Sequence, residues 1–276
     1  MLARRQLLEI HYQPWCPAAV RDGATDCLRL FAVVGRQFDG AVEPLARALA
    51  ATGDRYIVDL CAGSGGPWSG LYRRFSAAAQ PPIVVLTDLF PNQAAMASAH
   101  ARSGGRIQYV PDPVDATAVP AELPGLRTLF TAFHHFDPEN ARAILQDAVD
   151  AGQGIAIFEQ TQRSLFALLF MVVLAPLAWL GVPLIRPFRW SRLFWTYVIP
   201  AIPSVLAFDG IVSCLRTYSA DELKAMVESL DGAPYHWQIG CSRSLLSPLG
   251  ISYLVGYPLA GAGKGESAAP RVARTK

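Results

Sequence analysis

The chain has 276 residues, of which 52% are hydrophobic and 17% are charged, and its 24 basic and 22 acidic side chains leave a net charge of +2. Typical domains are about 25% charged, so this composition excludes a disordered chain and a highly charged coiled coil. The chain also lacks the basic excess of a protein that binds nucleic acid over its whole surface.

The five cysteines include no C-x-x-C pair, so they indicate neither a disulfide framework nor a zinc site. They fit a reducing compartment. The opening segment MLARRQLLEIHYQPW lacks the apolar core of a signal peptide. We therefore expect a cytoplasmic protein.

Residues 1–55 have an amphipathic helical pattern interrupted by prolines, and short apolar runs then alternate with helical segments. Short apolar strands that alternate with helices indicate a parallel sheet covered on both faces. The expected strands are residues 56–60, 83–86, 107–110, 126–133 and 154–158, and the expected helices are 68–79, 92–102 and 138–151.

An apolar insertion occupies residues 162–210, where the runs 164–185 and 198–208 contain no charged residue. As a helix, the first run would be about 33 Å long, which is enough to cross a bilayer. A single crossing would place parts of one sheet on opposite sides of the membrane. Prolines also interrupt both runs, at Pro176, Pro183, Pro200 and Pro203. We therefore expect a shallow hairpin or a buried cap instead of a span.

The link between the two runs is basic and aromatic. Arg186, Arg189 and Arg192 have the spacing of one helix face, and Phe188 and Trp190 lie between them. This pattern is typical of contact with a membrane surface that carries anionic lipids. Three roles stay open for residues 164–208: membrane-surface contact, a cap over a hydrophobic substrate, or a homodimer interface.

The last part of the chain returns to the α/β pattern. Ser219 and Glu222 have the spacing of a capping box for a helix at 220–230. Two strand-like runs, 235–239 and 251–257, are close enough in sequence to form an antiparallel pair. Residues 261–276 are small, polar and basic, and we expect them to be a disordered tail.

A glycine-rich turn, CAGSGGP, follows the first expected strand at residues 61–67. Glycines allow the backbone to approach a ligand closely, and the following helix offers free N–H groups. A dinucleotide site would need a third glycine where Trp68 stands. A nicotinamide-dependent oxidoreductase is therefore disfavoured.

This segment resembles the first motif of the class I S-adenosylmethionine-dependent methyltransferases, an acidic residue followed by alternating glycines. Asp59, Gly63 and Gly65 match it, and Cys61 replaces the first glycine. Asp88, at the end of the second expected strand, suits the two hydroxyls of a ribose because a carboxylate accepts two hydrogen bonds. Residues 114–120 resemble the family's third motif, whose acid and neighbouring residue contact adenine. The resemblance covers about residues 54–160 and, more loosely, 211–258.

The resemblance implies a Rossmann-like α/β fold with a mostly parallel seven-stranded sheet, an antiparallel last strand and helices on both faces. Residues 1–55 would form a helical lid, residues 56–161 and 211–260 the core that binds S-adenosylmethionine, and residues 162–210 a helical cap. The implied cofactor contacts are Asp59, Cys61, Ala62, Gly63, Ser64, Gly65, Asp88, Leu89, Asp115, Ala116 and Phe133.

In the resembled family the carboxyl end of the fourth strand faces the transferable methyl group. Here this strand leads into His134 and His135, and imidazole is the side-chain base that titrates closest to neutral pH. Because consecutive strand residues point to opposite sides, we expect the two histidines to have different roles. Glu159, at the end of the fifth strand, is a second candidate base. If the methyl acceptor is a carboxylate, it is already ionised and no general base is needed.

The candidate catalytic residues are therefore His134, His135 and Glu159, with no metal. The expected substrate or lid contacts are Tyr12, Trp15, Trp68, Arg163, Arg186 and Trp190.

The implied function is methyl transfer from S-adenosylmethionine to the oxygen or nitrogen of a small lipophilic or aromatic acceptor, with S-adenosylhomocysteine as product. The alternative is an inactive protein of this fold that acts in binding or as a scaffold. A nucleic-acid methyltransferase is disfavoured, since residues 133–136 lack an Asn/Asp-Pro-Pro-Tyr/Phe motif. The insertion adds the expectation of a peripheral position on the inner face of a membrane.

Overall fold

The computed structural model describes residues 2–63, 65–75, 81–186, 188–244 and 247–259. The predicted tail at 261–276 lies outside these residues. The chain divides into two compact units. The helical unit comprises Met1–Gln37, Gln160–Ser219 and Arg243–Gly250, and the sheet unit comprises Phe38–Glu159, Ala220–Ser242 and Ile251–Lys276.

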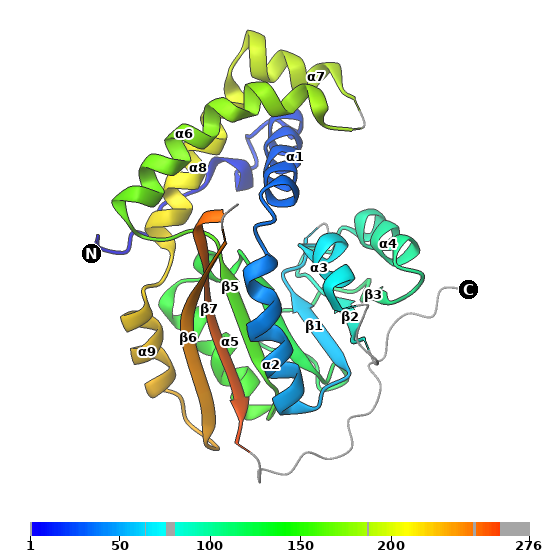
Figure 1. The fold of residues 1–276 in the computed structure, drawn as a ribbon, viewed down its shortest axis with the longest axis vertical. Helices are drawn as coiled ribbons and strands as arrows, with labels where there is room; N and C mark the ends of the chain where they lie inside the picture. The colour runs from blue at the N-terminus through cyan, green and yellow to red at the C-terminus, as the bar shows by residue number, and fades with distance from the viewer. Residues whose placement is uncertain (1, 64, 76–80, 187, 245–246, 260–276) are drawn as a thin grey trace. The chain divides into compact units, whose positions relative to one another are not determined.

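The sheet unit contains a seven-stranded sheet in the order β3-β2-β1-β4-β5-β7-β6 (Figure 1). β1 pairs in parallel with β2 and β4, β2 with β3, and β4 with β5, whereas β7 runs antiparallel to β5. The predicted fold class is confirmed. The strands are β1 (Tyr56–Leu60), β2 (Ile83–Leu86), β3 (Ile107–Tyr109), β4 (Leu126–Phe130), β5 (Ile155–Glu159), β6 (Tyr235–Ser244) and β7 (Ser247–Pro258).

The helices of the sheet unit are α2 (Val42–Thr52), α3 (Trp68–Phe75), α4 (Gln93–Arg102), α5 (Pro138–Asp150) and α9 (Ala220–Glu228). Local sequence fixes where two of them begin. The Asn92 side chain accepts a hydrogen bond from the N–H of Ala95, and Asp137 caps α5 in the same way in front of Pro138. The expected end of α3 at residue 79 lies outside the described residues.

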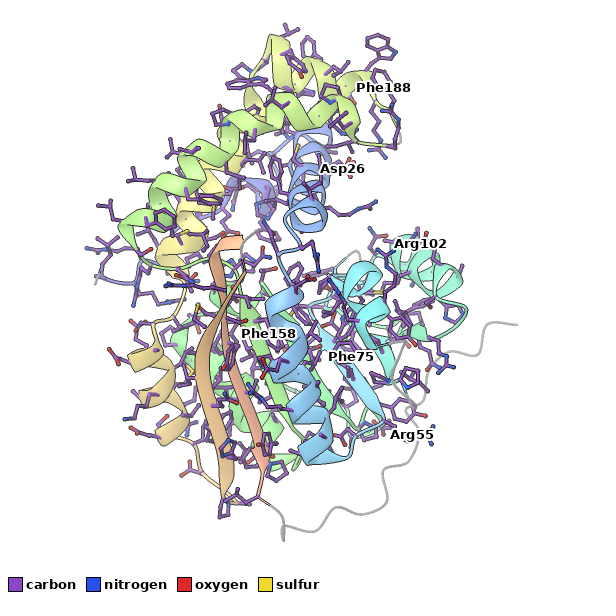
Figure 2. The ribbon with its side chains drawn as sticks, in the orientation of Figure 1. Asp26, Arg55, Phe75, Arg102, Phe158 and Phe188 are labelled. Carbon is purple, nitrogen blue, oxygen red and sulfur yellow. The ribbon has the colours of Figure 1, made fainter. Side chains whose placement is uncertain are left out.

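The core of the sheet unit lies between the strands and the helices that cover them. Leu45 of α2 and Phe75 of α3 pack in one cluster with Phe130 and Phe158 of the central strands (Figure 2). Phe130 and Phe158 stack with their ring centroids 5.0 Å apart. The central strands β4 and β5 are buried along their whole length, as expected for parallel strands covered on both faces.

The helical unit contains α1 (Ala18–Val34), α6 (Leu165–Gly181), α7 (Trp190–Leu193) and α8 (Ala201–Arg216). Its core joins Val20 and Cys27 of α1 with Ala178 of α6 and Ile202 and Leu206 of α8. α6 packs along α8, where a side chain at Gly210 would lie only 3.0 Å from the sulfur of Met171. The two apolar runs therefore form a pair of packed helices.

Two expectations for the insertion are corrected. Pro176 does not interrupt the first run, because α6 continues through it and is held along its length by α8. The three arginines do not share a helix face either, since α7 has only four residues and begins after Arg189. Arg192 is buried and bonded to Asp26, whereas Arg186 is exposed and donates to the carbonyl of Pro183.

One helix of the described chain is long and apolar enough to cross a membrane. It runs from Leu165 to Leu184, with a mean hydropathy of 2.5 and 28% of its window buried. The segments Trp190–Val198 and Ala201–Arg216 pass the same test only as a pair, and they are bent by 75°.

We predict that Gly125→Ala lowers the free energy of unfolding by more than about 2 kcal/mol, because the backbone before β4 needs glycine. Its φ is +139°, and a Cβ there would lie 2.6 Å from the carbonyl oxygen of Tyr56. Gly152→Ala is the matched control, with φ +64° and open space around its Cβ, and should cost only about 1 kcal/mol. Urea unfolding measures both, and equal losses would contradict the prediction.

Candidate functional site

The carboxyl ends of the parallel strands bring the predicted motifs to one edge of the sheet. β2, β1, β4 and β5 are consecutive neighbours in the sheet. Asp59 therefore lies beside the segments that follow β2 and β4, and Glu159 ends the next strand. In open α/β sheets, ligands bind at this edge.

The turn after β1 has the left-handed backbone that its glycines predict. Gly63, Gly65 and Gly66 have φ values of +53°, +102° and +51°. Cys61, which stands where the motif has its first glycine, also has a positive φ of +56°. Such a conformation strains an L-residue, and a small side chain limits that strain. Ser64, an expected cofactor contact, lies outside the described residues.

The Asp88 carboxylate ties this turn to the segment after β2. Its Oδ2 accepts a hydrogen bond of 2.7 Å from the N–H of Gly63, and its Oδ1 accepts one of 2.8 Å from the N–H of Phe90. Each carboxylate oxygen can accept two hydrogen bonds. The half-buried Asp88 is therefore oriented by the backbone and can still accept a hydrogen bond from a diol on each oxygen.

Asp59 is fully buried at the end of β1. Its Oδ1 accepts a hydrogen bond of 2.6 Å from the hydroxyl of Thr128 on β4, and its backbone carbonyl accepts two from Thr87. Burial raises the pKa of Asp59 to about 7, the hydrogen bond from Thr128 opposes this rise, and the charge of Asp88 adds to it.

Cys61 is an inert thiol in this arrangement. Burial raises its pKa to about 12, and the charges of Asp88, Asp59 and Asp115 act in the same direction. A thiol that stays protonated at neutral pH is a poor nucleophile. Cys61 therefore serves as a small side chain in the turn.

The third predicted motif lies next to Asp88, since the N–H of Val114 donates to the carbonyl of Asp88 at 2.9 Å. Asp115 is exposed, and its Oδ1 accepts hydrogen bonds from the N–H and hydroxyl of Thr117 at 2.8 and 2.7 Å. Ala116 is buried behind it. Leu89, the residue after Asp88, is exposed and adds an apolar side chain on the same segment.

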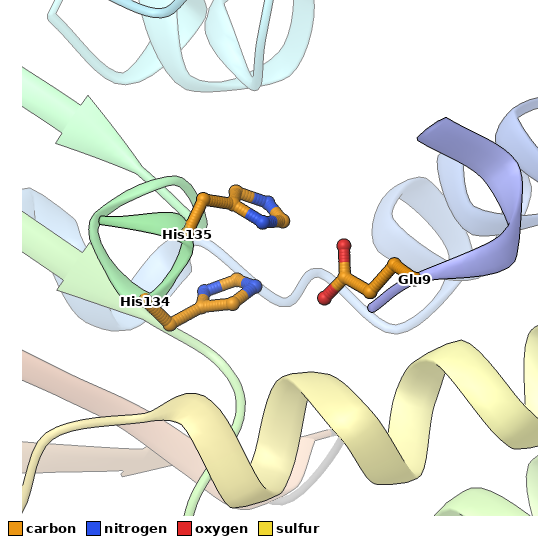
Figure 3. A group of neighbouring side chains, drawn as sticks. All are labelled: Glu9, His134 and His135. Atoms are coloured by element: carbon orange, nitrogen blue, oxygen red, sulfur yellow. The ribbon is translucent and has the colours of Figure 1, made fainter. Parts of the chain in front are cut away.

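His134 and Glu159 form a buried pair. The Nδ1 of His134 lies 2.8 Å from Oε2 of Glu159, and the backbone N–H of His134 donates to Oε1 at 3.1 Å. The ring of His135 lies beside that of His134, with the centroids 4.1 Å apart (Figure 3). A carboxylate that accepts from Nδ1–H fixes the tautomer and leaves Nε2 as the basic atom.

The two histidines do not continue β4, which is a correction to the strand expected to reach residue 133. β4 ends at Phe130, Thr131 takes a left-handed φ of +49°, and Phe133–His135 form a 3-10 turn. Consecutive side chains in such a turn do not alternate between two faces. The histidine rings therefore lie side by side, with His134 buried and His135 half-buried.

The remaining predicted contacts fall into two groups. Phe133 and Trp68 are buried in the sheet unit, and Trp68 packs edge-on against Phe130 in the core. Trp68 is therefore a packing residue and not a surface lid. The other expected contacts lie in the helical unit, where Tyr12, Trp15, Arg186 and Trp190 are exposed and Arg163 is buried.

Sequence reasoning missed Thr128 and Thr87, the residues that hold Asp59. Both threonines are fully buried: Thr128 lies within β4, and Thr87 follows β2 directly. A threonine inside a fully buried strand needs a hydrogen-bond partner, and that requirement was the available signal.

No protein-family model and no curated protein matches the sequence. Solved structures resemble the fold. The O-methyltransferase NcsB1 from neocarzinostatin biosynthesis, in complex with S-adenosylhomocysteine and 1,4-dihydroxy-2-naphthoic acid, has a TM-score of 0.51 at 18% identity, over 88% of this chain and 59% of that one. The plantazolicin methyltransferase BpumL, in complex with S-adenosylhomocysteine, has a TM-score of 0.50 at 9% identity, over 91% and 93% of the two chains.

A third structure, an O-methyltransferase family protein from Burkholderia thailandensis, has a TM-score of 0.47 at 16% identity, over 87% of this chain and 63% of that one. The chain thus spans about three fifths of the length of the first structures that it matches, with 59%, 63% and 64% covered. Identities this low establish the fold alone. That fold is the class I methyltransferase fold, as the resemblance in the glycine motif implies.

We predict that Asp59 makes the protein less stable as pH rises. Its folded pKa of about 7 lies above the usual 3.8, so the folded state binds more protons between about pH 4 and 7. The free energy of unfolding should therefore fall through this window, by on the order of 2–4 kcal/mol from this group. Urea unfolding at a series of pH values measures the slope.

Asp59→Asn is the control, because its amide oxygen still accepts from Thr128 but does not titrate. The variant should lose the part of the slope that Asp59 contributes. If the free energy of unfolding depends on pH in the same way for the wild type and the variant, the prediction is contradicted.

Proposed function

We propose that this protein is an S-adenosylmethionine-dependent methyltransferase that methylates the oxygen or nitrogen of a small lipophilic or aromatic acceptor and releases S-adenosylhomocysteine. The observation that carries the proposal is the geometry at one sheet edge, where an oriented Asp88 carboxylate and a left-handed glycine turn occur with a His134–Glu159 pair.

The residues at this edge fit the cofactor. Asp88 would offer both oxygens to the ribose diol, and Asp115 with Ala116, which follow Val114 next to Asp88, would contact the adenine. A side chain at Gly63 would stand in open space at the turn, which leaves its backbone free for close approach. When bound, S-adenosylmethionine supplies an activated methyl group on a sulfonium.

The chain then has to position the acceptor and remove its proton. Glu159 holds the imidazole of His134 through Nδ1, so that Nε2 can take the proton from a hydroxyl or amine as the acceptor attacks. Burial of the pair keeps its orientation fixed. If the acceptor is a carboxylate, it carries no proton to be removed, and the chain only has to position it.

The lipophilic character of the acceptor is inferred from the insertion and from a structural neighbour. NcsB1 is an O-methyltransferase bound to a hydroxynaphthoic acid. Residues 164–208 add an apolar surface that the cofactor fold does not require. We propose that they contact the inner face of a membrane, where a lipophilic acceptor is concentrated; a substrate cap or a homodimer interface are the other roles for the same residues.

We predict that calorimetry gives binding of S-adenosylmethionine and of S-adenosylhomocysteine, and that Asp88→Ala weakens both at least tenfold. The reason is the loss of two hydrogen bonds to a diol, each of which involves a charged acceptor. Asp150→Ala, at the exposed end of α5, is the matched control and should leave affinity unchanged. Failure of the wild type to bind either ligand would refute the proposed function.

We predict that His134→Asn lowers kcat by roughly 10²–10⁴ and leaves the affinity for S-adenosylmethionine within about threefold. The amide can still donate to Glu159 but cannot act as a base. Turnover is measured with 1,4-dihydroxy-2-naphthoic acid and a panel of phenols as probes. His135→Asn, which removes the neighbouring ring, should lower kcat less than tenfold.

An equal loss in the two histidine variants would contradict the assignment of His134 as the base. Binding of the cofactor without transfer to any probe, together with no effect of His134→Asn, would favour a binding or scaffold protein.

A further inference from the structure

An apolar stripe runs along the whole of α6 on the solvent side of the helical unit. Its side chains are spaced three and four residues apart, and the opposite face buries Ala167, Ala175 and Ala178. The stripe comprises Leu165, Phe166, Leu169, Val172, Val173, Leu177 and Leu180, each at least 43% exposed.

The stripe is too long and too continuous for the surface of an ordinary soluble domain. Exposed apolar residues on soluble proteins are normally scattered, and large contiguous patches mark interaction sites. Apolar exposure continues past α6 into the following segment, where Leu184 is 70% exposed and Trp190 is 78% exposed. Phe188 packs edge-on against Trp190, with the ring centroids 5.1 Å apart.

The charges of this segment have one sign. Residues 160–208 contain four arginines and no aspartate or glutamate. Two of the arginines, Arg189 and Arg192, are paired with Asp22 and Asp26 of α1. Arg186 is exposed, and its hydrogen bond goes to a carbonyl, which does not neutralise it. Arg5 adds an exposed basic residue at the other end of the α6–α8 pair, where its N–H donates to Leu215 near the end of α8. Basic residues thus lie at both ends of an uncharged apolar face.

We infer that this stripe rests on the surface of a bilayer rich in anionic lipids, with α6 lying in the plane of the membrane and not across it. This inference rests on the membrane contact proposed above, and it is independent of the methyl-transfer chemistry. Apolar side chains enter the acyl region, and the flanking arginines meet lipid phosphates.

The helices around α6 argue against a span. α8 carries Asp209, which accepts hydrogen bonds from the N–H groups of Ile10 and His11 and from the His11 ring. α1 packs on α8 and presents the exposed Asp22 and Arg29. A transmembrane α6–α8 hairpin would carry these groups into hydrocarbon, at a high cost for each charge.

A second copy fits the stripe less well than a lipid surface does. A two-fold dimer places the same patch on both partners. Arg189 and Arg192 are already paired with Asp22 and Asp26 of α1. In a two-fold dimer Arg186 and Arg5 would meet basic residues of the other copy, and residues 160–208 contain no carboxylate to pair with them. Anionic lipid supplies a negative charge for these two arginines.

The first test is flotation of the full-length protein with vesicles, in the absence of cofactor. We expect binding to phosphatidylcholine vesicles that contain 30% phosphatidylglycerol (on the order of a bacterial anionic content) and at least tenfold weaker binding to phosphatidylcholine alone. Leu169→Glu and Val173→Glu should each weaken binding at least tenfold. Leu28→Glu, an exposed leucine of α1 in the same unit, is the matched control and should bind as the wild type does.

Circular dichroism of each variant separates loss of the surface from loss of folding. Equal effects of Leu28→Glu and Leu169→Glu, or no vesicle binding by a folded wild type, would overturn the inference. Sedimentation that shows a dimer dispersed by Leu169→Glu, without vesicle binding, would assign the stripe to a second copy instead.

The second test measures how deeply α6 lies in the bilayer. Spin labels at Leu165→Cys, Val173→Cys and Leu180→Cys are placed in a Cys241→Ser background, because Cys241 is an exposed native cysteine. An in-plane helix gives all three labels the same shallow depth. A deep central label between two shallow ends would demonstrate a span and overturn the inference.

Neither test requires S-adenosylmethionine or a methyl acceptor. Their failure would leave the proposed methyl transfer untouched, and failure to bind S-adenosylmethionine would leave a positive vesicle result standing.

Discussion

Asp59 joins three strands, and the site is arranged around that junction. Its backbone carbonyl accepts from Thr87, and its carboxyl group accepts from Thr128. The residue pairs with Leu86 on one side and with Thr128 on the other, so one position sets the register of both neighbouring strands. A buried carboxyl group is costly, and it persists where its hydrogen bonds specify a unique arrangement. That arrangement places Asp88 and the histidine turn at the same edge.

The sequence was most informative where secondary structure follows local periodicity. The apolar runs at 56–60 and 83–86 are the observed strands β1 and β2, and Asn92 and Asp137 begin α4 and α5 as caps. The alternation of strand and helix was enough to predict a parallel sheet. The place of Asp88 beside the glycine turn also followed from its position in the sequence, because it comes just after the strand next to that turn.

The residues at which helices and strands end were harder to predict. A run of apolar residues does not indicate where a strand ends and a turn begins. The run from Phe130 to Phe133 reads as a continuing strand, but Thr131 takes a left-handed conformation and a 3-10 turn follows. The turn brings His134 into contact with Glu159, which is 25 residues away in the sequence. Arg192 is a similar case, since its partner Asp26 is 166 residues distant. Spacing alone placed this buried arginine on one helix face with Arg186 and Arg189, as part of a membrane-contact pattern.

The hydrophobic fraction of the chain has two physical origins that composition cannot separate. In the sheet unit, residues such as Ile57 and Leu129 are apolar because parallel strands are covered on both faces. In α6 the same kinds of residue are exposed, although the helix passes the same hydropathy test as the core of a soluble protein. Burial distinguishes the two, because a core helix loses its apolar surface to other helices, whereas α6 retains most of it. The exposed part of α6 is an apolar surface that no other helix of the described chain covers, and the hydrophobic effect favours its removal from water.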